Sequence, residues 1–394
     1  MAEPWLSIIG LGEDGLPGLA PASRIALDAA DVVFGGPRHL ALAEVGARGR
    51  VWQVPFSVAP VLDCRGSRVA VLASGDPFWH GAGGCLAAHL AGEEWRCFPA
   101  PSTFSHAAAR LGWRLEDTLC LGLHAAPLAR LSPLLGRDVR AICLLRDGAA
   151  AAGLADWLVR HGFGGSLLTV MESLGGPKER VRVAPAEGFA LTGIAAPVAV
   201  AIEARGAGLP RACGLPDDLF DHDGQITKRP MRALTLSALA PRAGEVLWDI
   251  GSGSGSVSIE WLLAAPGTRA FGLEADPQRA ARARANAERF GLAHRLTIRD
   301  APAPEGLQML PRPDAVFVGG GASEELFARI WDLVPPGTRI VANAVTVETQ
   351  SLLAGWSSRR GGGLLRIALE EASPLGGKRA WRAALPVVQW SVVR

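Results

Sequence analysis

The chain contains no tyrosine and only six cysteines among its 394 residues. Tyrosine therefore cannot serve as a catalytic acid, a base or a stacking residue. The cysteines form no CxxC pair and have no histidine at ligand spacing, which argues against a zinc site and against a disulfide framework. We expect no bound metal and interpret these residues as small buried hydrophobic side chains. They are Cys64, Cys85, Cys97, Cys120, Cys143 and Cys213.

A strong net charge and long apolar runs are also missing. The 40 Lys and Arg against 38 Asp and Glu give a net charge of +2, so nothing favours a nucleic acid or an anionic membrane as the main partner. No apolar run approaches the roughly 18 residues of a spanning helix, and the start, MAEPWLSIIGLGEDG, has no basic leader. We expect a soluble, cytoplasmic protein.

Glycine and proline are abundant, with 48 and 28 residues, in a chain of ordinary hydrophobic content. This composition predicts a folded protein with many tight turns, and the length predicts two domains. Short apolar runs alternate with helical patterns from Trp5 to about Arg205, which indicates a mostly parallel α/β sheet. A Pro/Gly/Asp-rich segment, 206–231, follows as a linker.

A second α/β series follows this linker. Its clearest helix is expected just after Asp276, which can cap the N-terminus, and Gly291 is expected to end it. LLRIALEEASPLGG followed by LPVVQWSVV at the C-terminus predicts a closing hairpin.

The most informative stretch is WDIGSGSGSVSIEW at 248–261. Gly251, Gly253 and Gly255 allow a sharp turn and a close ligand approach. Ser256 stands where a dinucleotide fingerprint would have its last glycine. Asp249 would repel a pyrophosphate but can accept hydrogen bonds from an ammonium group.

Acidic residues also end the next two predicted strands. Glu274 lies about 20 residues beyond the first glycine, the distance at which an acid reaches a ribose diol. Asp300 ends the third strand, where it could meet an adenine amino group. An ammonium, a ribose and an adenine together describe S-adenosylmethionine, with a dehydrogenase or a plain Rossmann core as alternatives.

This constellation resembles the class I methyltransferase fold. GLPDDLFDHDGQITKRPMRALTLSAL, DAPAPEGL, DAVFVGGGASEEL and RIVANAVTVETQSLL make residues 211–394 similar to the C15-methylating subunit of the cobalamin pathway. The resemblance implies cofactor contacts, and it places substrate at the strand end 319–321. Thr227 and Asp300 could instead be local caps, and the three glycines could serve close packing. The predicted cofactor-binding residues are Thr227, Gly251, Ser252, Gly253, Ser254, Gly255, Glu274, Asp300 and Ala301. The three glycines predicted at the substrate site are Gly319, Gly320 and Gly321.

The first half carries VAVLASGDPFWHGAGG and FPAPSTFSHAAARLGW. With IIGLGEDGLPGLAP and LLTVMESLGGPKERV, these segments resemble the tetrapyrrole (class III) methyltransferases, particularly their C5-methylating precorrin branch. The resemblance implies a cofactor folded between two α/β lobes, beside Gly75, Asp76, Ser102 and Thr103. The first loop departs from the usual G-x-G-P-G-D pattern, since it reads GLGEDG.

Together the halves resemble bifunctional precorrin methyltransferases. The resemblance implies a tetrapyrrole methylase domain (1–205), a cofactor-contacting linker (206–230) and a class I methyltransferase domain (231–394). It further implies two S-adenosylmethionine sites, methylation of precorrin-6Y at C5 and C15, loss of the ring C acetate carboxyl as CO2 to give precorrin-8, and a homo-oligomer. No catalytic side chain is identified.

The many carboxylates of such a substrate favour basic ligands. The candidates are Lys228, Arg229 and Arg232, together with Lys378, Arg379 and Arg382; each could instead be a solvated surface charge. Arg279, Arg282 and Arg284 are expected on the exposed face of their helix.

Two other functions are compatible with the sequence. One is methylation of RNA, which the near-neutral charge and the lack of an aromatic platform disfavour. The other is a single active C-terminal methyltransferase whose N-terminal domain is a non-catalytic scaffold.

Overall fold

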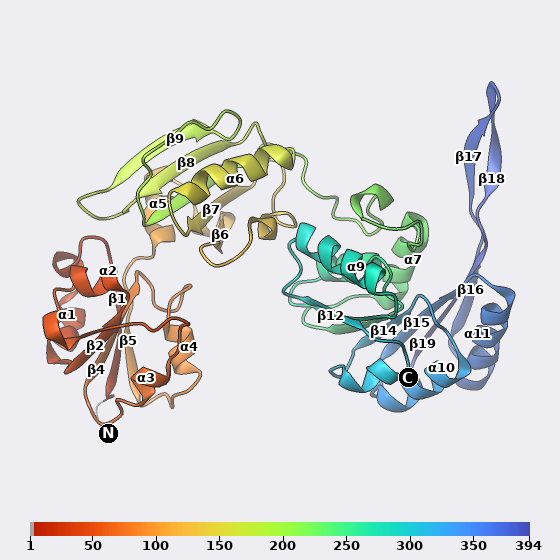
Figure 1. The fold of residues 1–394 in the computed structure, drawn as a ribbon, viewed down its shortest axis with the longest axis horizontal. Helices are drawn as coiled ribbons and strands as arrows, with labels where there is room; N and C mark the ends of the chain where they lie inside the picture. The colour runs from red at the N-terminus through yellow and green to blue at the C-terminus, as the bar shows by residue number, and fades with distance from the viewer. Residues whose placement is uncertain (1–3) are drawn as a thin grey trace. The chain divides into compact units, whose positions relative to one another are not determined.

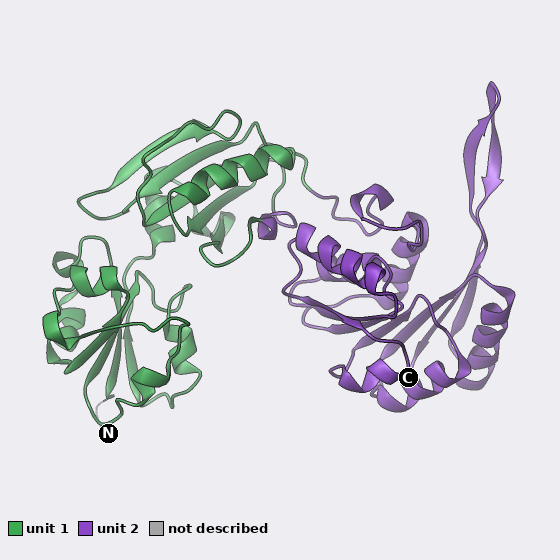
Figure 2. Cartoon of the chain, in the orientation of Figure 1, with its two compact units in different colours: residues 1–128, 135–208 green, residues 129–134, 209–394 purple. Residues whose placement is uncertain are grey.

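The computed structural model describes residues 4–394, which divide into two compact units (Figures 1 and 2). Unit 1 comprises the described residues up to Leu128 together with Leu135–Gly208, and unit 2 comprises Ala129–Leu134 together with Leu209–Arg394. Segment 129–134 therefore belongs with unit 2, although it comes from the first half of the chain. The sequence analysis did not predict this assignment.

Unit 1 begins with a five-stranded sheet in the order β3-β2-β4-β1-β5, in which every pairing is parallel. β1 and β4 are buried along nearly their whole length, as expected for apolar strands with helices on both sides. The strands are β1 (Leu6–Leu11), β2 (Val32–Gly35), β3 (Gly49–Val51), β4 (Val69–Ser74) and β5 (Trp95–Phe98). The helices are α1 (Pro21–Ala29), α2 (Pro37–Leu42), α3 (Ala59–Leu62) and α4 (Gly83–Ala87).

The second lobe of unit 1 has a sheet in the order β6-β7-β10-β8-β9. Only β6 and β7 pair in parallel; the other three pairings are antiparallel. The prediction of a mostly parallel sheet was therefore wrong for this lobe, because short loops can join antiparallel strands without the helical crossover that parallel strands require. The elements are α5 (Thr103–Leu111), β6 (Leu119–Gly122), β7 (Arg140–Leu145), α6 (Ala149–Arg160), β8 (Leu167–Glu172), β9 (Arg180–Pro185) and β10 (Val198–Glu203).

Unit 2 is built on a seven-stranded sheet in the order β13-β12-β11-β14-β15-β19-β16. β19 is antiparallel to both neighbours, and the first five strands are parallel. The chain runs outward from β11 to β13 and then returns to β14 on the other side. This reversal creates a switch point beside the carboxyl end of β11, where ligands of open α/β sheets bind. The strands are β11 (Val246–Ile250), β12 (Arg269–Glu274), β13 (Leu296–Asp300), β14 (Ala315–Val318), β15 (Arg339–Ala344), β16 (Gly363–Ile367) and β19 (Val387–Val393).

Helices cover both faces of this sheet (Figure 1). Leu247 faces a core formed with α7, α8 and α9, whereas Trp248 faces a core formed with α10 and α11, as the alternation of side chains along a strand requires. The helices are α7 (Arg229–Leu239), α8 (Ser256–Ala264), α9 (Pro277–Arg289), α10 (Glu324–Leu333) and α11 (Val347–Arg360).

The predicted helix and hairpin of the second half are confirmed. Asp276 caps α9 by accepting hydrogen bonds from the Gln278 and Arg279 amides, and Gly291 follows the helix with φ +71°. β16 and β19 form the closing antiparallel pair. Between them a two-stranded ribbon, β17 (Glu370–Leu375) and β18 (Lys378–Ala383), projects from the sheet (Figure 1); the sequence did not predict it.

The interpretation of the cysteines as buried was wrong for most of them. Cys143 is buried, whereas Cys85 and Cys213 are exposed and the other three are half-buried. Across residues 4–394 there is no group of three or more His, Cys, Asp or Glu side chains able to hold a metal ion. No helix in the same range is long and apolar enough to cross a membrane.

Candidate cofactor and substrate sites

The glycine loop of unit 2 lies at the switch point between β11 and β14. Gly251 has φ +71°, a left-handed conformation that favours glycine. A Cβ atom added there would lie 2.8 Å from the Gly320 amide nitrogen, which is too close for any side chain. The loop and the glycines after β14 therefore meet at one edge of the sheet.

Asp249 is the buried acid that precedes this loop. Ser258 Oγ donates a 2.6 Å hydrogen bond to Asp249 Oδ2, while Oδ1 is buried with no protein partner in the described chain. Burial raises the pKa of the Asp249 carboxyl to about 6, and the Glu274 charge adds to this, although the bonds from Ser258 oppose it. One carboxylate oxygen is thus left without a protein partner beside the glycine loop, although Asp249 itself is not among the residues that line the adjacent cavity.

Glu274 ends the neighbouring strand β12 and is fixed by backbone amides. Its Oε2 accepts from Gly253 N–H at 2.8 Å, and its Oε1 accepts from Asp276 N–H at 3.0 Å. The carboxylate is therefore tied to the glycine loop and faces the same cavity. This is the position that the sequence predicted for a ribose-binding acid.

A cavity of about 1230 Å³ opens over these residues. Its walls include most of the cofactor and substrate residues predicted for this half. Those that line it are Thr227, Lys228, Arg229, Gly251, Ser252, Gly253, Ser254, Glu274, Ala301, Gly319, Gly320 and Gly321. Gly255, Asp300 and Arg232 are not among the lining residues.

Each of these three has another structural position. Asp300 forms an ion pair with Arg284. Gly255, with φ +72°, starts α8 where a Cβ atom would lie 3.1 Å from Ala283 Cβ, so it permits helix packing. Arg232 is fully buried and is treated next.

Arg232 does not have the predicted substrate-facing position. Its guanidinium is completely buried and forms ion pairs with Glu260 and Asp217. It also donates to the backbone carbonyls of Thr227 and Leu215, so it links the connecting segment to the sheet. These contacts give it a structural role, so of the three predicted substrate-binding cations only Lys228 and Arg229 are on the cavity wall.

Other expectations for basic residues also changed. Arg279 lines the cavity while pairing with Asp223, so it is not simply on the exposed face of α9. Lys378, Arg379 and Arg382 lie on the exposed strand β18 and do not line the cavity.

The sequence analysis missed Asn343, which lines the cavity from β15. Its Nδ2 donates to Thr235 Oγ1 at 2.9 Å, and its Oδ1 accepts from Gln389 Nε2 at 2.9 Å. An amide inside the apolar run RIVANAV was the available signal. Gln389 faces it in strand register, and only the folded sheet reveals that pairing.

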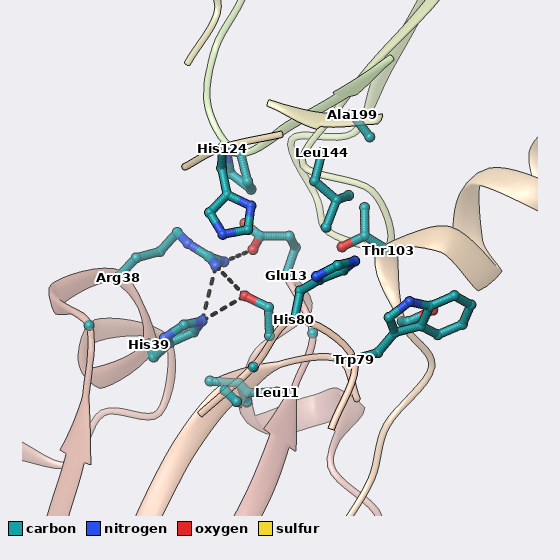
Figure 3. A pocket seen from close by; sticks show the side chains of 18 of the residues that line it. Leu11, Glu13, Arg38, His39, Trp79, His80, Thr103, His124, Leu144 and Ala199 are labelled. Atoms are coloured by element: carbon teal, nitrogen blue, oxygen red, sulfur yellow. Dashed lines mark hydrogen bonds and ion pairs between the residues drawn. The ribbon is translucent and has the colours of Figure 1, made fainter. Parts of the chain in front are cut away.

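Unit 1 has a separate cavity of about 580 Å³ between its two sheets (Figure 3). Gly75, Ser102 and Thr103 line it, as predicted for cofactor contacts. Gly75 has φ +56°, and a Cβ atom there would lie 2.7 Å from Ser102 Cα. Ser102 caps α5 by accepting a hydrogen bond from Ser105 N–H at 3.1 Å. The turn at Gly75 and the start of α5 at Ser102 are therefore each held in one geometry.

Asp76 is not among the residues that line this cavity. Its Oδ1 accepts from Phe78 N–H at 2.9 Å, a side-chain turn typical of aspartate. The structure therefore does not bring Asp76 together with Gly75, Ser102 and Thr103 on the cavity wall.

A polar cluster that the sequence did not predict lies on the same wall (Figure 3). Arg38 forms an ion pair with Glu13, and its Nη2 donates to Ser74 Oγ at 2.8 Å. His39 Nε2 lies 3.0 Å from Arg38 Nη2 and 2.8 Å from Ser74 Oγ. Burial, with a contribution from Arg38, lowers the pKa of His39 to about 4, so its imidazole is neutral at pH 7.

Glu13 belongs to the loop that departs from the usual family pattern. A Cβ atom on Gly176 would lie 2.6 Å from Glu13 Cβ, so the second sheet's loop closes directly over this residue. Arg38 in the first lobe therefore neutralises the acid of the unusual GLGEDG sequence, and Gly176 in the second lobe leaves space for its side chain.

The residues of the unit 2 cavity fit S-adenosylmethionine. Asp249 Oδ1 and Ser254 Oγ are buried polar atoms without protein partners in the described chain, as expected where a ligand supplies a cationic or polar group. Glu274 adds an acceptor suited to a diol. In unit 1 the glycine turn at Gly75 packs against Ser102 on the cavity wall. The unit 1 cavity has the size of a small-molecule site, and the unit 2 cavity is larger.

Family comparisons identify the class of protein that these features define. Residues 6–190 match the family described as "Tetrapyrrole (Corrin/Porphyrin) Methylases", and residues 218–394 match the "Precorrin methyltransferase domain". The chain thus combines a two-lobed tetrapyrrole methylase fold with a Rossmann-like class I methyltransferase domain, as predicted.

Whole-chain relatives narrow this class. The precorrin-6Y C(5,15)-methyltransferase [decarboxylating] of Sinorhizobium sp is 47% identical over 401 residues, which cover 99% of this chain and 97% of the relative. The protein of the same name from Mycobacterium tuberculosis (strain ATCC 25618 / H37Rv) is 38% identical over 98% of this chain and 99% of its own. The chain therefore belongs to the precorrin-6Y C(5,15)-methyltransferase (decarboxylating) family.

A solved structure is also similar to the second half. The C-terminal domain of precorrin-6Y C5,15-methyltransferase from Rhodobacter capsulatus is 52% identical, with a TM-score of 0.46, and the match covers 47% of this chain and 100% of that one. Membership of this family confirms that the chain is a methyltransferase that uses S-adenosylmethionine.

Proposed function

We propose that this chain methylates precorrin-6Y at C5 in unit 1 and at C15 in unit 2, and removes the ring C acetate carboxyl as CO2 to give precorrin-8. The observation that carries the proposal is the presence of two separate cavities, one per unit, each beside glycine-marked strand ends. Relatives that cover nearly the whole chain bear the corresponding name. They favour this activity over RNA methylation and over a scaffold role for the first half.

In unit 2 the residues would hold one S-adenosylmethionine, which supplies an electrophilic methyl group when bound. Asp249 Oδ1 and Ser254 Oγ are free to accept or donate on the amino acid side, and Glu274 is tied to the loop where a diol would lie. Thr227 and Ala301 complete the wall. Because these groups are fixed before the ligand arrives, little ordering remains at the moment of binding.

In unit 1 we propose a second S-adenosylmethionine site beside Gly75, Ser102 and Thr103. The left-handed turn at Gly75 lets the loop after β4 pack closely against Ser102, and the cap of α5 holds Ser102 in place. Asp76 was predicted to contact the cofactor; we propose instead that it acts indirectly, by accepting the Phe78 amide hydrogen bond that holds this turn.

The substrate's electron-rich meso carbons are the nucleophiles, so the protein's task is to orient them. Lys228 and Arg229 on the wall of the unit 2 cavity are placed to hold substrate carboxylates, because a cation recognises them through charge-assisted hydrogen bonds. Holding a reactant in line can contribute about 7–11 kcal/mol to a barrier reduction. When the ring C carboxyl leaves as CO2, its electron pair passes to the macrocycle.

The test uses the full chain, precorrin-6Y and S-adenosylmethionine, with mass spectrometry of the product. We expect two methyl groups gained and one CO2 lost per substrate, and calorimetry is expected to show two S-adenosylhomocysteine sites per chain. The matched variants Gly75→Ala and Gly251→Ala should each remove one of the sites and one methylation. A single site that only Gly251→Ala removes would contradict the proposal.

We also propose that the protein is a homo-oligomer. Its exposed ribbon, β17–β18, leaves large apolar side chains such as Trp381 and Leu375 in solvent, and a lone two-stranded ribbon has little stability of its own. Light scattering of the full chain tests this expectation.

A further inference from the structure

His80 lies in the loop after β4, and its imidazole lines the unit 1 cavity (Figure 3). Its backbone has φ +60°, a conformation that is strained for a residue other than glycine and that clusters at functional sites. The ring packs against Phe104 with centroids 5.9 Å apart. Phe104 directly follows Thr103, a predicted cofactor contact.

The second lobe is shaped around this imidazole. Gly122 ends β6, and a Cβ atom there would lie 2.9 Å from His80 Nδ1. Any other residue at position 122 would therefore have to displace the ring. His124 follows two residues later, and its ring stands edge-on to His80 at 6.4 Å between centroids.

Some of the groups near His80 are already engaged. Glu13 is paired with Arg38, and the Nε2 of His39 is bound by Arg38 and Ser74, although its Nδ1 has no partner in the described chain. The side chains of His80, His106 and His124 all line the cavity, and none of them makes a hydrogen bond with any residue between 4 and 394. His80 differs from the other imidazoles by its strained backbone and by the space that Gly122 leaves for its ring.

Burial lowers the pKa of His80, and the adjacent His124 lowers it further. The neutral, proton-accepting form therefore dominates at pH 7. The same neighbour disfavours a lasting positive charge on His80, which favours rapid release of a captured proton.

Methylation of a meso carbon requires a proton acceptor. A meso carbon of a tetrapyrrole carries one hydrogen, so C5 bears both hydrogen and methyl once the new bond has formed. Conjugation returns only when the C5–H electron pair goes back to the macrocycle. The departing proton needs a base close to the methyl acceptor.

We infer that His80 is the base that takes the proton from C5, an inference that rests on the proposed function of unit 1. C5 forms its bond to the methyl carbon, and the bond from that carbon to sulfur breaks with its pair left on the thioether product. The C5–H bond then breaks, its pair enters the macrocycle, and the proton binds an imidazole nitrogen of His80. The sulfonium charge consumed equals the imidazolium charge formed.

The primary test is His80→Asn in the full chain. Asparagine tolerates a left-handed backbone but is not a base. General bases contribute about 10²- to 10⁴-fold, so we expect C5 methylation to fall at least about hundredfold. C15 methylation and S-adenosylhomocysteine affinity should stay within about twofold. The matched control is His161→Asn, since His161 stacks on Trp157 away from the cavity and its loss should leave both rates unchanged.

Two readouts separate proton transfer from a structural effect. With substrate deuterated at C5, single-turnover kinetics of His80→Asn should show a primary isotope effect larger than that of the wild type, because proton loss has become limiting. His80→Gly relieves the backbone strain and leaves space, so added imidazole should restore part of the C5 rate. This second variant also serves if His80→Asn folds poorly.

The outcomes are distinct. Wild-type C5 methylation with an unchanged rate in His80→Asn overturns the inference alone. A rate loss that is matched by lost S-adenosylhomocysteine binding and shows no isotope effect overturns it as well, since the residue would then be structural. A wild type that methylates C15 but never C5 overturns the proposed function of unit 1, and this inference with it.

Discussion

The two cavities of this chain, for which we propose the same cofactor, are built differently. In unit 2 one open sheet carries a glycine loop and the acids Asp249 and Glu274 on adjacent strands, with Glu274 on the cavity wall and Asp249 buried. In unit 1 the cavity lies between two sheets, and its polar wall includes Arg38 and several histidines. The unit 2 site lies at the edge of a single sheet, and the unit 1 site is a cavity between two lobes.

This difference determines which charges each site uses. The unit 2 site keeps a buried carboxylate with one oxygen unpaired, a feature suited to a cationic ligand group. The unit 1 wall instead pairs its acid, Glu13, internally with Arg38. The proposed unit 1 site would therefore depend mainly on cavity shape and neutral polar groups, whereas the proposed unit 2 site would use a fixed charge. The predictions below separate the two constructions.

The largest effect is expected for Arg232→Met in unit 2. Removing one member of a buried ion pair costs about 3–5 kcal/mol, because the partner charge stays buried and unpaired; here that partner is Glu260. Urea titration followed by hydrogen exchange in each unit should show unit 2 destabilised and unit 1 unchanged. The comparison variant in unit 1 is Arg180→Met, which removes a half-exposed arginine while Arg182 still pairs with Glu172.

The Arg180 variant is expected to cost about 1 kcal/mol or less. The double variant Arg232→Met/Glu260→Gln should regain part of the stability that the single variant loses, since no unpaired charge remains. Equal losses in the two single variants would contradict the view that only unit 2 depends on one buried cation.

Asp249→Asn should have the next largest effect. Losing a charge-assisted hydrogen bond to a cationic ligand costs about 1.5–3 kcal/mol, which is roughly 10- to 100-fold in affinity. Calorimetry with S-adenosylhomocysteine should show this loss at the unit 2 site only. Asp300→Asn is the control, because Asp300 pairs with Arg284 away from the cavity wall.

The Asp249 carboxylate should also make ligand affinity at the unit 2 site depend on pH. The pKa of Asp249 is raised from 3.8 to about 6, so the folded unit 2 without ligand holds this proton more tightly than the unfolded chain does. The free energy of unfolding of unit 2 therefore falls as pH rises between these two values. A cationic ligand group needs the ionised form, which is about 10% populated one unit below the pKa. Affinity at the unit 2 site should therefore rise about tenfold from pH 5 to pH 7, with proton release visible as buffer-dependent heat.

The unit 1 site should not show this carboxylate-dependent rise, because the carboxylate on its wall, Glu13, is already paired with Arg38. The Asp249→Asn variant should also lose the pH dependence at the unit 2 site. A parallel rise at both sites would mean that a group on the ligand, rather than Asp249, titrates.

Much of the unit 2 site could be predicted because its parts lie in contiguous motifs at the ends of parallel strands. Such ends meet at one edge of the sheet, so Gly251 and Glu274 could be brought together from spacing alone. Asp300 follows the same rule but turns to Arg284, and Arg232 is drawn into the core by Glu260. Both pairings connect different helices or strands, and a linear pattern does not encode them.

The unit 1 site was less predictable for a physical reason. Its imidazoles at positions 39, 80 and 124 come from separate loops and helices that converge only when both sheets form. The antiparallel pairings of the second sheet were also missed, because continuous apolar strands look alike in either direction. The turn SGDP indicated where the unit 1 cavity would lie. The strained backbone of His80 and the space left by Gly122 could not be predicted, because they depend on tertiary contacts.

The smallest effect is expected for Asp76→Ala, which bears on how unit 1 binds its ligand. Asp76 caps the Phe78 amide rather than lining the cavity, so its removal should cost about 0.5–1.5 kcal/mol of stability, the net value of one hydrogen bond. Affinity for S-adenosylhomocysteine at the unit 1 site should then fall no more than about threefold, and C5 methylation should persist. Asp76→Asn, which keeps an acceptor for Phe78 N–H, should restore the stability. If Asp76→Ala instead abolishes binding at the unit 1 site alone, this carboxylate contacts the ligand directly, and unit 1 uses a fixed charge as unit 2 does.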